Sequence, residues 1–270
     1  MNVTTPLLGQ ILLTIGTLIV VVPTRDGVVI VADSKSTRRT TAGASAGTSV
    51  TEKVFSLPGV PGTAFFVTGN SPVEWVPGDG GVATVVDARG VVTARLSRRG
   101  HVTREAFDAV ADECARLAAR LHRMGDLAAP LAGRELFTVA MIRAGSGTTP
   151  HEVASFVVRL TSRGADVSDR DWQGFGPADG ARVMMFGEGA FVGAGVAQWT
   201  GGAANCARAF LGSGERPVSR VNAQTAARGA YSILEAASTA MGVDGTVGPP
   251  FRAYVLTLGL RELPPVAPCR

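Results

Sequence analysis

Four residues of types that can act together in catalysis stand out in this chain. Thr17 follows Gly16 and begins a β-branched run, and Asp33 ends the next apolar run. Lys53 is one of only two lysines among 26 basic residues, and Asp244 precedes a glycine near the end of the sequence. A threonine hydroxyl becomes an effective nucleophile when a neighbouring base accepts its proton. A lysine ammonium lowers the pKa of groups nearby, and it needs a carboxylate partner when buried.

Three of these residues also have ordinary structural explanations. Thr17 could be a β-branched strand residue, Asp33 a strand-end cap and Lys53 a surface side chain. The rarity of lysine in this arginine-rich chain favours a specific need for an ammonium at Lys53. A guanidinium is wider than an ammonium and always charged. The functional interpretation therefore depends on the residues occurring together.

The elements that would position these residues begin with a predicted hairpin. Residues 17–22 and 28–32 are apolar, β-branched runs on either side of Arg25-Asp26-Gly27, which is a turn sequence. Residues 53–55 and 63–68 are predicted as two further short strands, separated by a Pro-Gly turn.

Helices and strands follow one another in groups along the rest of the chain. Residues 103–124 form the clearest predicted helix, because apolar residues recur at steps of three and four and Thr103 is a good N-cap. Further helices are expected at 199–210 and 221–241, and further strands at 136–142, 153–160, 182–186 and 252–258. Prolines and glycines interrupt residues 71–99, so a normal long helix is not expected there. This order favours an α+β layered sandwich over a doubly wound sheet.

The opening of the chain resembles that of a mature proteasome β subunit. Gly16-Thr17-Leu18-Ile19-Val20 is followed, at the family's spacing, by Asp26-Gly27, an apolar strand and Ala32-Asp33-Ser34. Lys53-Val54-Phe55 is similar to the family's lysine-bearing segment, after a longer loop. Asp244-Gly245-Thr246-Val247-Gly248 is similar to its late Asp-x-x-Ser-Gly-Gly motif. The resemblance is strong over residues 16–69, weak in the middle and good again over 221–258.

The resemblance implies an N-terminal-nucleophile (Ntn) hydrolase with a four-layer αββα sandwich. One domain would span residues 17–262, after a propeptide or leader at 1–16 and before a Pro-rich tail at 263–270. Thr17, freed by self-cleavage after Gly16, would be the nucleophile, and its α-amine would be the base. Lys53 would tune the hydroxyl, Asp33 would orient Lys53, and Asp244 would support the amine. A backbone amide near Gly69 would stabilise the oxyanion.

The implied activity is that of a threonine-type endopeptidase, made as a zymogen and acting on peptides or unfolded proteins without a metal or organic cofactor. A homo-oligomeric ring is implied by the resemblance alone. Two alternatives stay open. The chain could be a catalytically silent, structural proteasome-like subunit, or it could be anchored in a membrane by residues 6–22, which are apolar and free of charge.

Two departures from the family pattern bear on activity. Gly187-Glu188-Gly189 stands where the family has Gly-Ser-Gly, and Val247 occupies the second serine position of the late motif. Two hydroxyls of the family's proton relay are therefore missing. Glu188 could replace one of them as an acceptor, but Val247 could not.

Composition bears on which partners, metals and cellular compartment are expected for this chain. The net charge of +4 comes from scattered residues without a basic stripe, so nucleic acid is not an expected partner. The three cysteines and three histidines lack metal-ligand spacing. Free thiols in a reducing cytoplasm are the simplest expectation, since no positive residue precedes the apolar leader as in a signal peptide.

Overall fold

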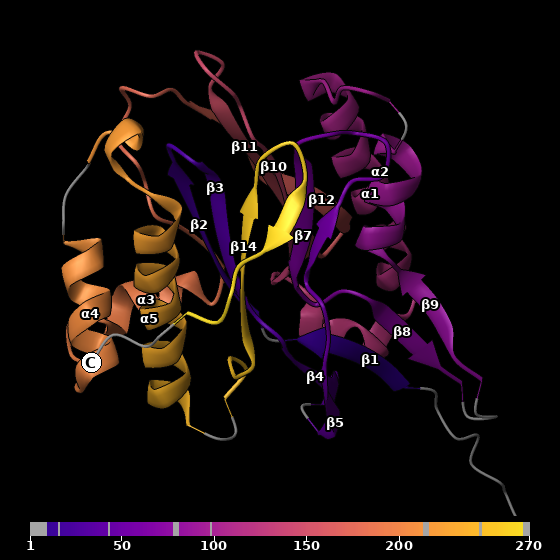
Figure 1. The fold of residues 1–270 in the computed structure, drawn as a ribbon. Coiled ribbons are helices and arrows are strands. Elements are labelled where there is room, and N and C mark those ends of the chain that lie inside the picture. Colours follow the sequence, from indigo (N-terminus) through magenta and orange to yellow (C-terminus); the bar gives the residue numbers. More distant parts are fainter. Residues whose placement is uncertain are drawn as a thin grey trace, which may run out of the picture.

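The computed structural model describes residues 10–15, 17–42, 44–77, 81–97, 99–212, 216–242 and 245–266. Within these residues the fold is mixed α/β, with three five-stranded antiparallel sheets and five α-helices. Two of the sheets lie face to face, and helices cover their outer faces (Figure 1).

The first sheet holds the beginning of the predicted site. Its order is β13 (Met184–Gly187), β2 (Leu18–Thr24), β3 (Gly27–Asp33), β14 (Phe251–Leu256) and β15 (Leu260–Glu262). Strands β2 and β3 form the predicted hairpin, and every residue in both is buried. Gly27 has φ +129° at the turn, and a Cβ there would lie 2.3 Å from the Leu256 carbonyl oxygen. Both strands are covered on both faces, which explains their continuous apolar sequences.

The second sheet packs against the first. Its order is β12 (Gly164–Phe175), β11 (His151–Thr161), β10 (Glu135–Arg143), β7 (Thr63–Gly69) and β6 (Val54–Ser56). Between the sheets lies an apolar cluster that includes Ile19, Ile30, Phe66 and Ile142. Burial of such side chains contributes about 1.5–3 kcal/mol each, so this cluster is a main source of the stability that fixes the site.

Helices cover the two outer faces (Figure 1). The helices α3 (Gly189–Gly195), α4 (Gly202–Leu211) and α5 (Ala223–Met241) lie on the first sheet, where α5 contacts β2, β3 and β14. The helices α1 (Ala88–Leu96) and α2 (Arg104–His122) lie on the other side, where α2 contacts β11 and β12. Thr103 caps α2 as predicted, because its hydroxyl accepts from the amide of Ala106 at 3.2 Å.

The third sheet joins segments from the beginning of the chain. Its order is β5 (Ser45–Val50), β4 (Lys35–Thr40), β1 (Gln10–Ile15), β8 (Val73–Val76) and β9 (Ala83–Val86). Residues 10–15 and 18–22 are thus strands, so this part of the proposed anchor is not helical. Among the residues described, no helix combines the length and apolar character needed to cross a membrane.

The region expected to lack a long helix contains β8, β9 and the nine-residue α1. Asp87 caps α1 by accepting from the amide of Gly90 at 2.9 Å. The expectation of three free cysteines is wrong, since Cys206 is disulfide-bonded while Cys114 is a buried free thiol. Burial raises the pKa of the Cys114 thiol to about 12, so this side chain acts as a small core residue.

His151 links the two central sheets. It begins β11, and its Nε2 lies 2.9 Å from the carbonyl oxygen of Thr24 at the tip of the β2–β3 hairpin. The amide of Gly145 donates to its Nδ1 at 3.0 Å, which leaves the proton on Nε2. Burial lowers the pKa of His151, although the hydrogen bond to Thr24 opposes the effect. The hydrogen bonds and the burial therefore both favour the neutral imidazole of His151 in the folded protein.

Candidate active site

Thr17 lies immediately before β2 and is 6% exposed. Its carbonyl oxygen accepts from the amide of Glu188 at 3.0 Å. Gly187 has φ +78°, and a Cβ at that position would lie 2.0 Å from the Thr17 oxygen. Only glycine therefore lets the β13–α3 turn approach Thr17 so closely. This contact fixes the backbone of the predicted nucleophile from the first sheet.

Asp33 and Lys53 form a buried ion pair, and Lys53 lines the same pocket as Thr17. Lys53 Nζ lies 3.1 Å from each carboxylate oxygen of Asp33, and it also donates to the carbonyl oxygen of Lys35. Asp33 Oδ1 accepts from the amide of Leu18 at 2.9 Å, which ties the carboxylate to the residue after Thr17. Asp33 is fully buried and Lys53 is nearly so. The structure thus brings together three of the four predicted site residues.

The electrostatics of this pair are dominated by burial. Burial raises the pKa of Asp33 to about 6, although the Lys53 charge and the amides of Leu18 and Gly248 oppose the rise. Burial likewise lowers the pKa of Lys53, against the opposing charge of Asp33. Each group therefore needs the other to remain charged at neutral pH. A strongly perturbed pair beside a cleft is typical of a functional site.

Lys35 is a site residue that the sequence reasoning missed. Its Nζ donates to the carbonyl oxygen of Gly245 at 2.5 Å, and its side chain lies against Gly248, where a Cβ would be 2.7 Å from Lys35 Cδ. The loop that contains Gly245 and Gly248 is thereby held against β4. Asp244 lies outside the described residues. No local pattern around Lys35 indicates this contact, which joins residues 210 positions apart in the sequence.

The two departures from the family pattern occupy different environments. Val247 is 1% exposed and packs in the apolar cluster beneath α5, so it presents no polar group to the site. Glu188 is half-buried, and its Oε1 accepts from the hydroxyl of Thr246 at 3.0 Å. A hydroxyl thus reaches Glu188 from the position before Val247. This Thr246–Glu188 bond lies next to the carbonyl contact of Thr17.

A pocket of about 430 Å³ opens at Thr17 and Lys53. Strands β1, β4, β5, β6, β7 and β9 and helix α1 contribute to its walls, together with the segments before β2, β6, β8 and α1. Its lining residues are Thr14, Thr17, Ser36, Arg38, Ser49, Thr51, Glu52, Lys53, Phe55, Val67, Gly69, Ser71, Pro72, Thr84, Asp87 and Arg89. Gly69, near the predicted oxyanion hole, has φ +88°, and a Cβ there would lie 2.7 Å from the Leu136 oxygen. The oxyanion role of this turn stays a prediction.

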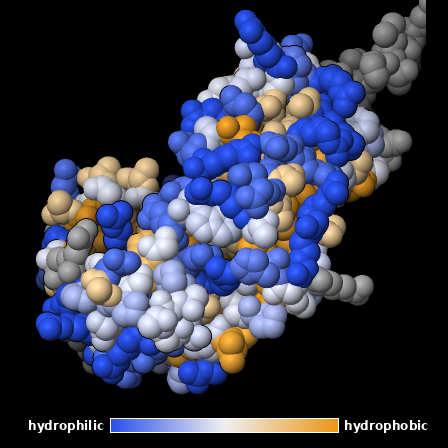
Figure 2. All heavy atoms as spheres, turned by 90° about the horizontal axis from the view of Figure 1, so that it is seen from above, coloured by the Kyte–Doolittle hydropathy of each residue, from blue (hydrophilic) through white to orange (hydrophobic). Residues whose placement is uncertain are grey.

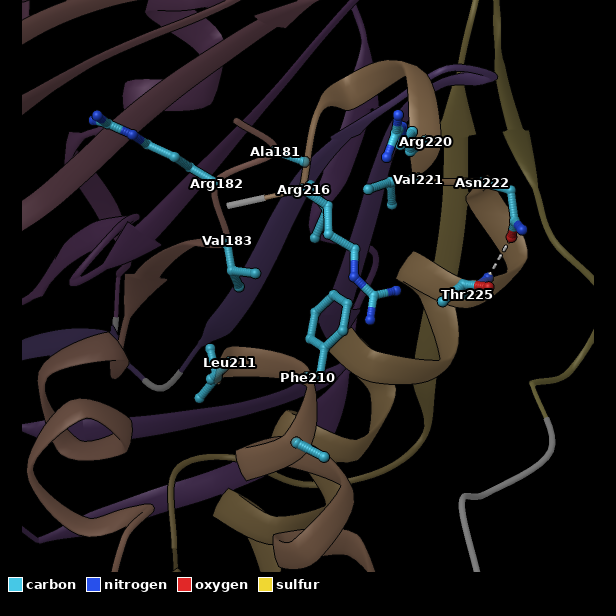
Figure 3. A pocket seen from close by; sticks show the side chains of 12 residues that line it. Ala181, Arg182, Val183, Phe210, Leu211, Arg216, Arg220, Val221, Asn222 and Thr225 are labelled. Atoms are coloured by element: carbon cyan, nitrogen blue, oxygen red, sulfur yellow. Dashed lines mark hydrogen bonds between the residues drawn. The ribbon is translucent and has the colours of Figure 1, made fainter. Parts of the chain in front are cut away.

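A larger pocket of about 630 Å³ lies elsewhere, at the start of α5 (Figure 3). Arg216 points into it beside Phe210, whereas Arg182 points away, and the Asn222 side chain accepts from the amide of Thr225. Of the predicted site residues that the structure describes, Thr17, Asp33 and Lys53, none lines this pocket. The smaller pocket at Thr17 is therefore the better candidate for chemistry.

The face of the molecule drawn in Figure 2 is mainly hydrophilic. Figure 2 shows hydrophobic side chains scattered in small groups on the face in view. Large exposed hydrophobic side chains among the described residues are few, namely Val50, Val82 and Leu258.

Fold and site together define a mixed α/β protein with a buried threonine, aspartate and lysine beside a cleft. No family model matches the chain, and no curated protein matches it in sequence. Among solved structures, it is similar to that of the Gly-1 mutant of Anbu from Hyphomicrobium sp. strain MC1. The two share 15% sequence identity with a TM-score of 0.43, over 92% of this chain and 86% of that one.

Proposed function

We propose that this chain is an Ntn hydrolase of the proteasome β-subunit kind, with a four-layer αββα sandwich and Thr17 as its nucleophile. The observation that carries the proposal is the buried Asp33–Lys53 pair, which is bonded to the amide of Leu18 directly after Thr17. Removing two charges from water costs free energy that their mutual attraction does not always recover. Stability alone is therefore a weak explanation for a buried ion pair at this position. Their place near a threonine in a cleft supports a catalytic purpose.

The first reaction is cleavage of the chain's own backbone. The Thr17 hydroxyl oxygen attacks the carbonyl carbon of Gly16, and the peptide nitrogen leaves as the α-amine of Thr17, giving an ester. Water hydrolyses this ester to a Gly16 carboxylate and a free Thr17 hydroxyl. The new α-amine, with an ordinary pKa of about 7.7–8.0, then serves as the base for peptide substrates.

In the second reaction the same hydroxyl attacks the scissile carbonyl of a peptide. The α-amine accepts the hydroxyl proton and delivers it to the departing amine, and water then hydrolyses the acyl-enzyme ester. Lys53 would lower the pKa of the hydroxyl, Asp33 would hold Lys53, and Asp244 would support the amine. Peptide or unfolded protein substrates and a homo-oligomeric ring are parts of this proposal. A cytoplasmic location is also part of it, but the disulfide at Cys206 removes the argument from free thiols that first suggested it.

The experiment that tests the proposal is the intact mass of the denatured protein. We expect a chain beginning at Thr17, and an uncut chain when Thr17 is replaced by alanine. An electrophile selective for N-terminal threonine should label the cut chain alone. Active protein that begins at Met1 or Asn2 would contradict the assignment of the nucleophile.

A catalytically silent proteasome-like subunit is the second candidate. The buried Val247 favours it, because no hydroxyl can come from that position of the late motif. A parent protein that is neither cut after Gly16 nor labelled at Thr17 would favour this candidate over the first.

A further inference from the structure

Strand β1, which lies just before Thr17, is the central strand of the third sheet. It pairs antiparallel with β4 on one edge and with β8 on the other, so that Leu12 lies opposite both Thr40 and Glu74. The pairs β4–β5 and β8–β9 are joined to each other in this sheet through β1. Removing β1 would therefore expose two strand edges and divide the sheet.

The two faces of β1 differ in burial. Ile11 is fully buried and Leu13 is 7% exposed, and both pack in the apolar cluster that includes Val73 and Leu96. Leu12 and Thr14 point to the other face and are half-buried, and Thr14 lines the pocket at Thr17. The strand thus anchors itself by alternate apolar side chains while it forms one wall of the candidate active site.

Cleavage between Gly16 and Thr17 would break one peptide bond and none of these contacts. Loss of the strand would leave a cavity where Ile11 and Leu13 pack, and such cavities are costly. We propose that the slot between β4 and β8 is a binding groove for an extended peptide and that the leader remains in it after cleavage. A displacing peptide would need apolar residues at the positions of Ile11 and Leu13, five and three residues before the new carboxylate.

The cut itself rests on the proposed function, whereas the groove does not. The two can be separated with the full-length protein in two forms. One is the unmodified chain, and the other carries a site-specific protease recognition sequence inserted between Gly16 and Thr17. In each form, denaturing mass spectrometry reports the cut, and native mass spectrometry reports whether the leader stays bound. Failure of self-cleavage in the first form would count against the proposed function, and the second form would still test the groove.

The matched variants are Leu13→Ala and Leu12→Ala, which make the same chemical change on opposite faces of β1. After the cut, we expect the leader to dissociate at least about tenfold faster from the Leu13→Ala protein than from the parent. The Leu12→Ala protein should stay within about threefold of the parent. Equal effects of the two changes, or a parent leader lost as soon as the chain is cut, would overturn the proposal.

A synthetic peptide with the sequence of residues 10–16 provides a second measurement, which does not depend on folding of a variant. When labelled and added to the cut parent protein, it should exchange with the resident leader. The same peptide with aspartate at the positions of Ile11 and Leu13 should not. Equal exchange of both peptides would show that the groove does not select apolar residues and would refute its assignment.

Discussion

Replacing Lys53 with methionine should destabilise the fold by about 3–5 kcal/mol, because it leaves Asp33 buried without its counter-charge. The Lys53 Nζ lies 3.1 Å from both carboxylate oxygens. At an effective dielectric constant of about 20, this distance corresponds to an attraction of about 5 kcal/mol. Without Lys53, the donors to the carboxylate among the described residues would be the backbone amides of Leu18 and Gly248.

The loss of folding stability caused by Lys53→Met should depend on pH. The pKa of Asp33 is raised to about 6 in the folded protein, above its ordinary value of 3.8. A raised carboxyl pKa stabilises the fold at low pH, and this contribution is lost as the pH rises through the folded-state pKa. Removing Lys53 raises that pKa further. The Lys53→Met deficit should therefore be larger at pH 7.5 than at pH 5, where the carboxyl is protonated in the variant.

The assay is a double-mutant cycle with Lys53→Met and Asp33→Asn, measured by urea unfolding. All four proteins should carry Thr17→Ala, so that none is cut and all have the same covalent structure. The double variant should lose less stability than the two single changes added together, by about 2–3 kcal/mol. Arg163→Met, which removes a cation from an exposed turn, serves as the control and should change stability by less than about 0.5 kcal/mol.

Additivity of the two changes within about 0.5 kcal/mol would refute the coupling. In proteins that retain Thr17, Lys53→Met should also prevent cleavage after Gly16, while Arg163→Met should not. A Lys53→Met chain that is cut at the parent rate would refute the catalytic role even if the stability cycle behaves as expected.

Three other perturbations test separate contacts. Gly187→Ala should abolish cleavage before Thr17, because the new Cβ would lie 2.0 Å from the Thr17 carbonyl oxygen. The control is Gly147→Ala, which has a similar positive φ but open space around it, and it should be cut normally in the same mass assay. The unfolding free energy of the parent should fall relative to that of His151→Gln as the pH drops below about 6.5. The reason is that the pKa of His151 is lowered in the folded protein, so protonation favours the unfolded chain. Urea midpoints of the two proteins that run parallel from pH 7.5 to 5 would contradict this. Thr246→Val should slow peptide cleavage by about tenfold or more if the Thr246–Glu188 bond positions a proton-transfer group, and its pH–rate profile should shift; an unchanged rate and profile would leave that bond a structural role only.

The parts of the fold that could be predicted from sequence are those set by local signals. The Asp26-Gly27 turn between two β-branched runs is sufficient to predict the β2–β3 hairpin, and Thr103 before an amphipathic run is sufficient for α2. The pairing of Asp33 with Lys53 could be expected because a buried lysine needs a carboxylate. These arguments use only short-range patterns and charge balance.

The features that could not be predicted from sequence depend on contacts between residues far apart in the chain. Nothing local in the apolar residues 10–15 indicates that they form the centre of a sheet between β4 and β8. Lys35 reaches Gly245 across most of the chain, so its place in the site follows from tertiary packing alone. The helix α1 forms despite the nearby prolines and glycines, because Asp87 caps it and Val92 and Leu96 are buried beneath it.

The scarcity of lysine makes the site accessible to a selective chemical label. A chain that begins at Thr17 has three aliphatic amines, which are its α-amine and the side chains of Lys35 and Lys53. Reductive methylation with ¹³C-formaldehyde would therefore give three methylamine signals from this chain, and a leader that stays bound would add one more from its own α-amine. Because arginine does not react, the titration of the three signals would report the ionisation of this site directly, without any substitution in the protein.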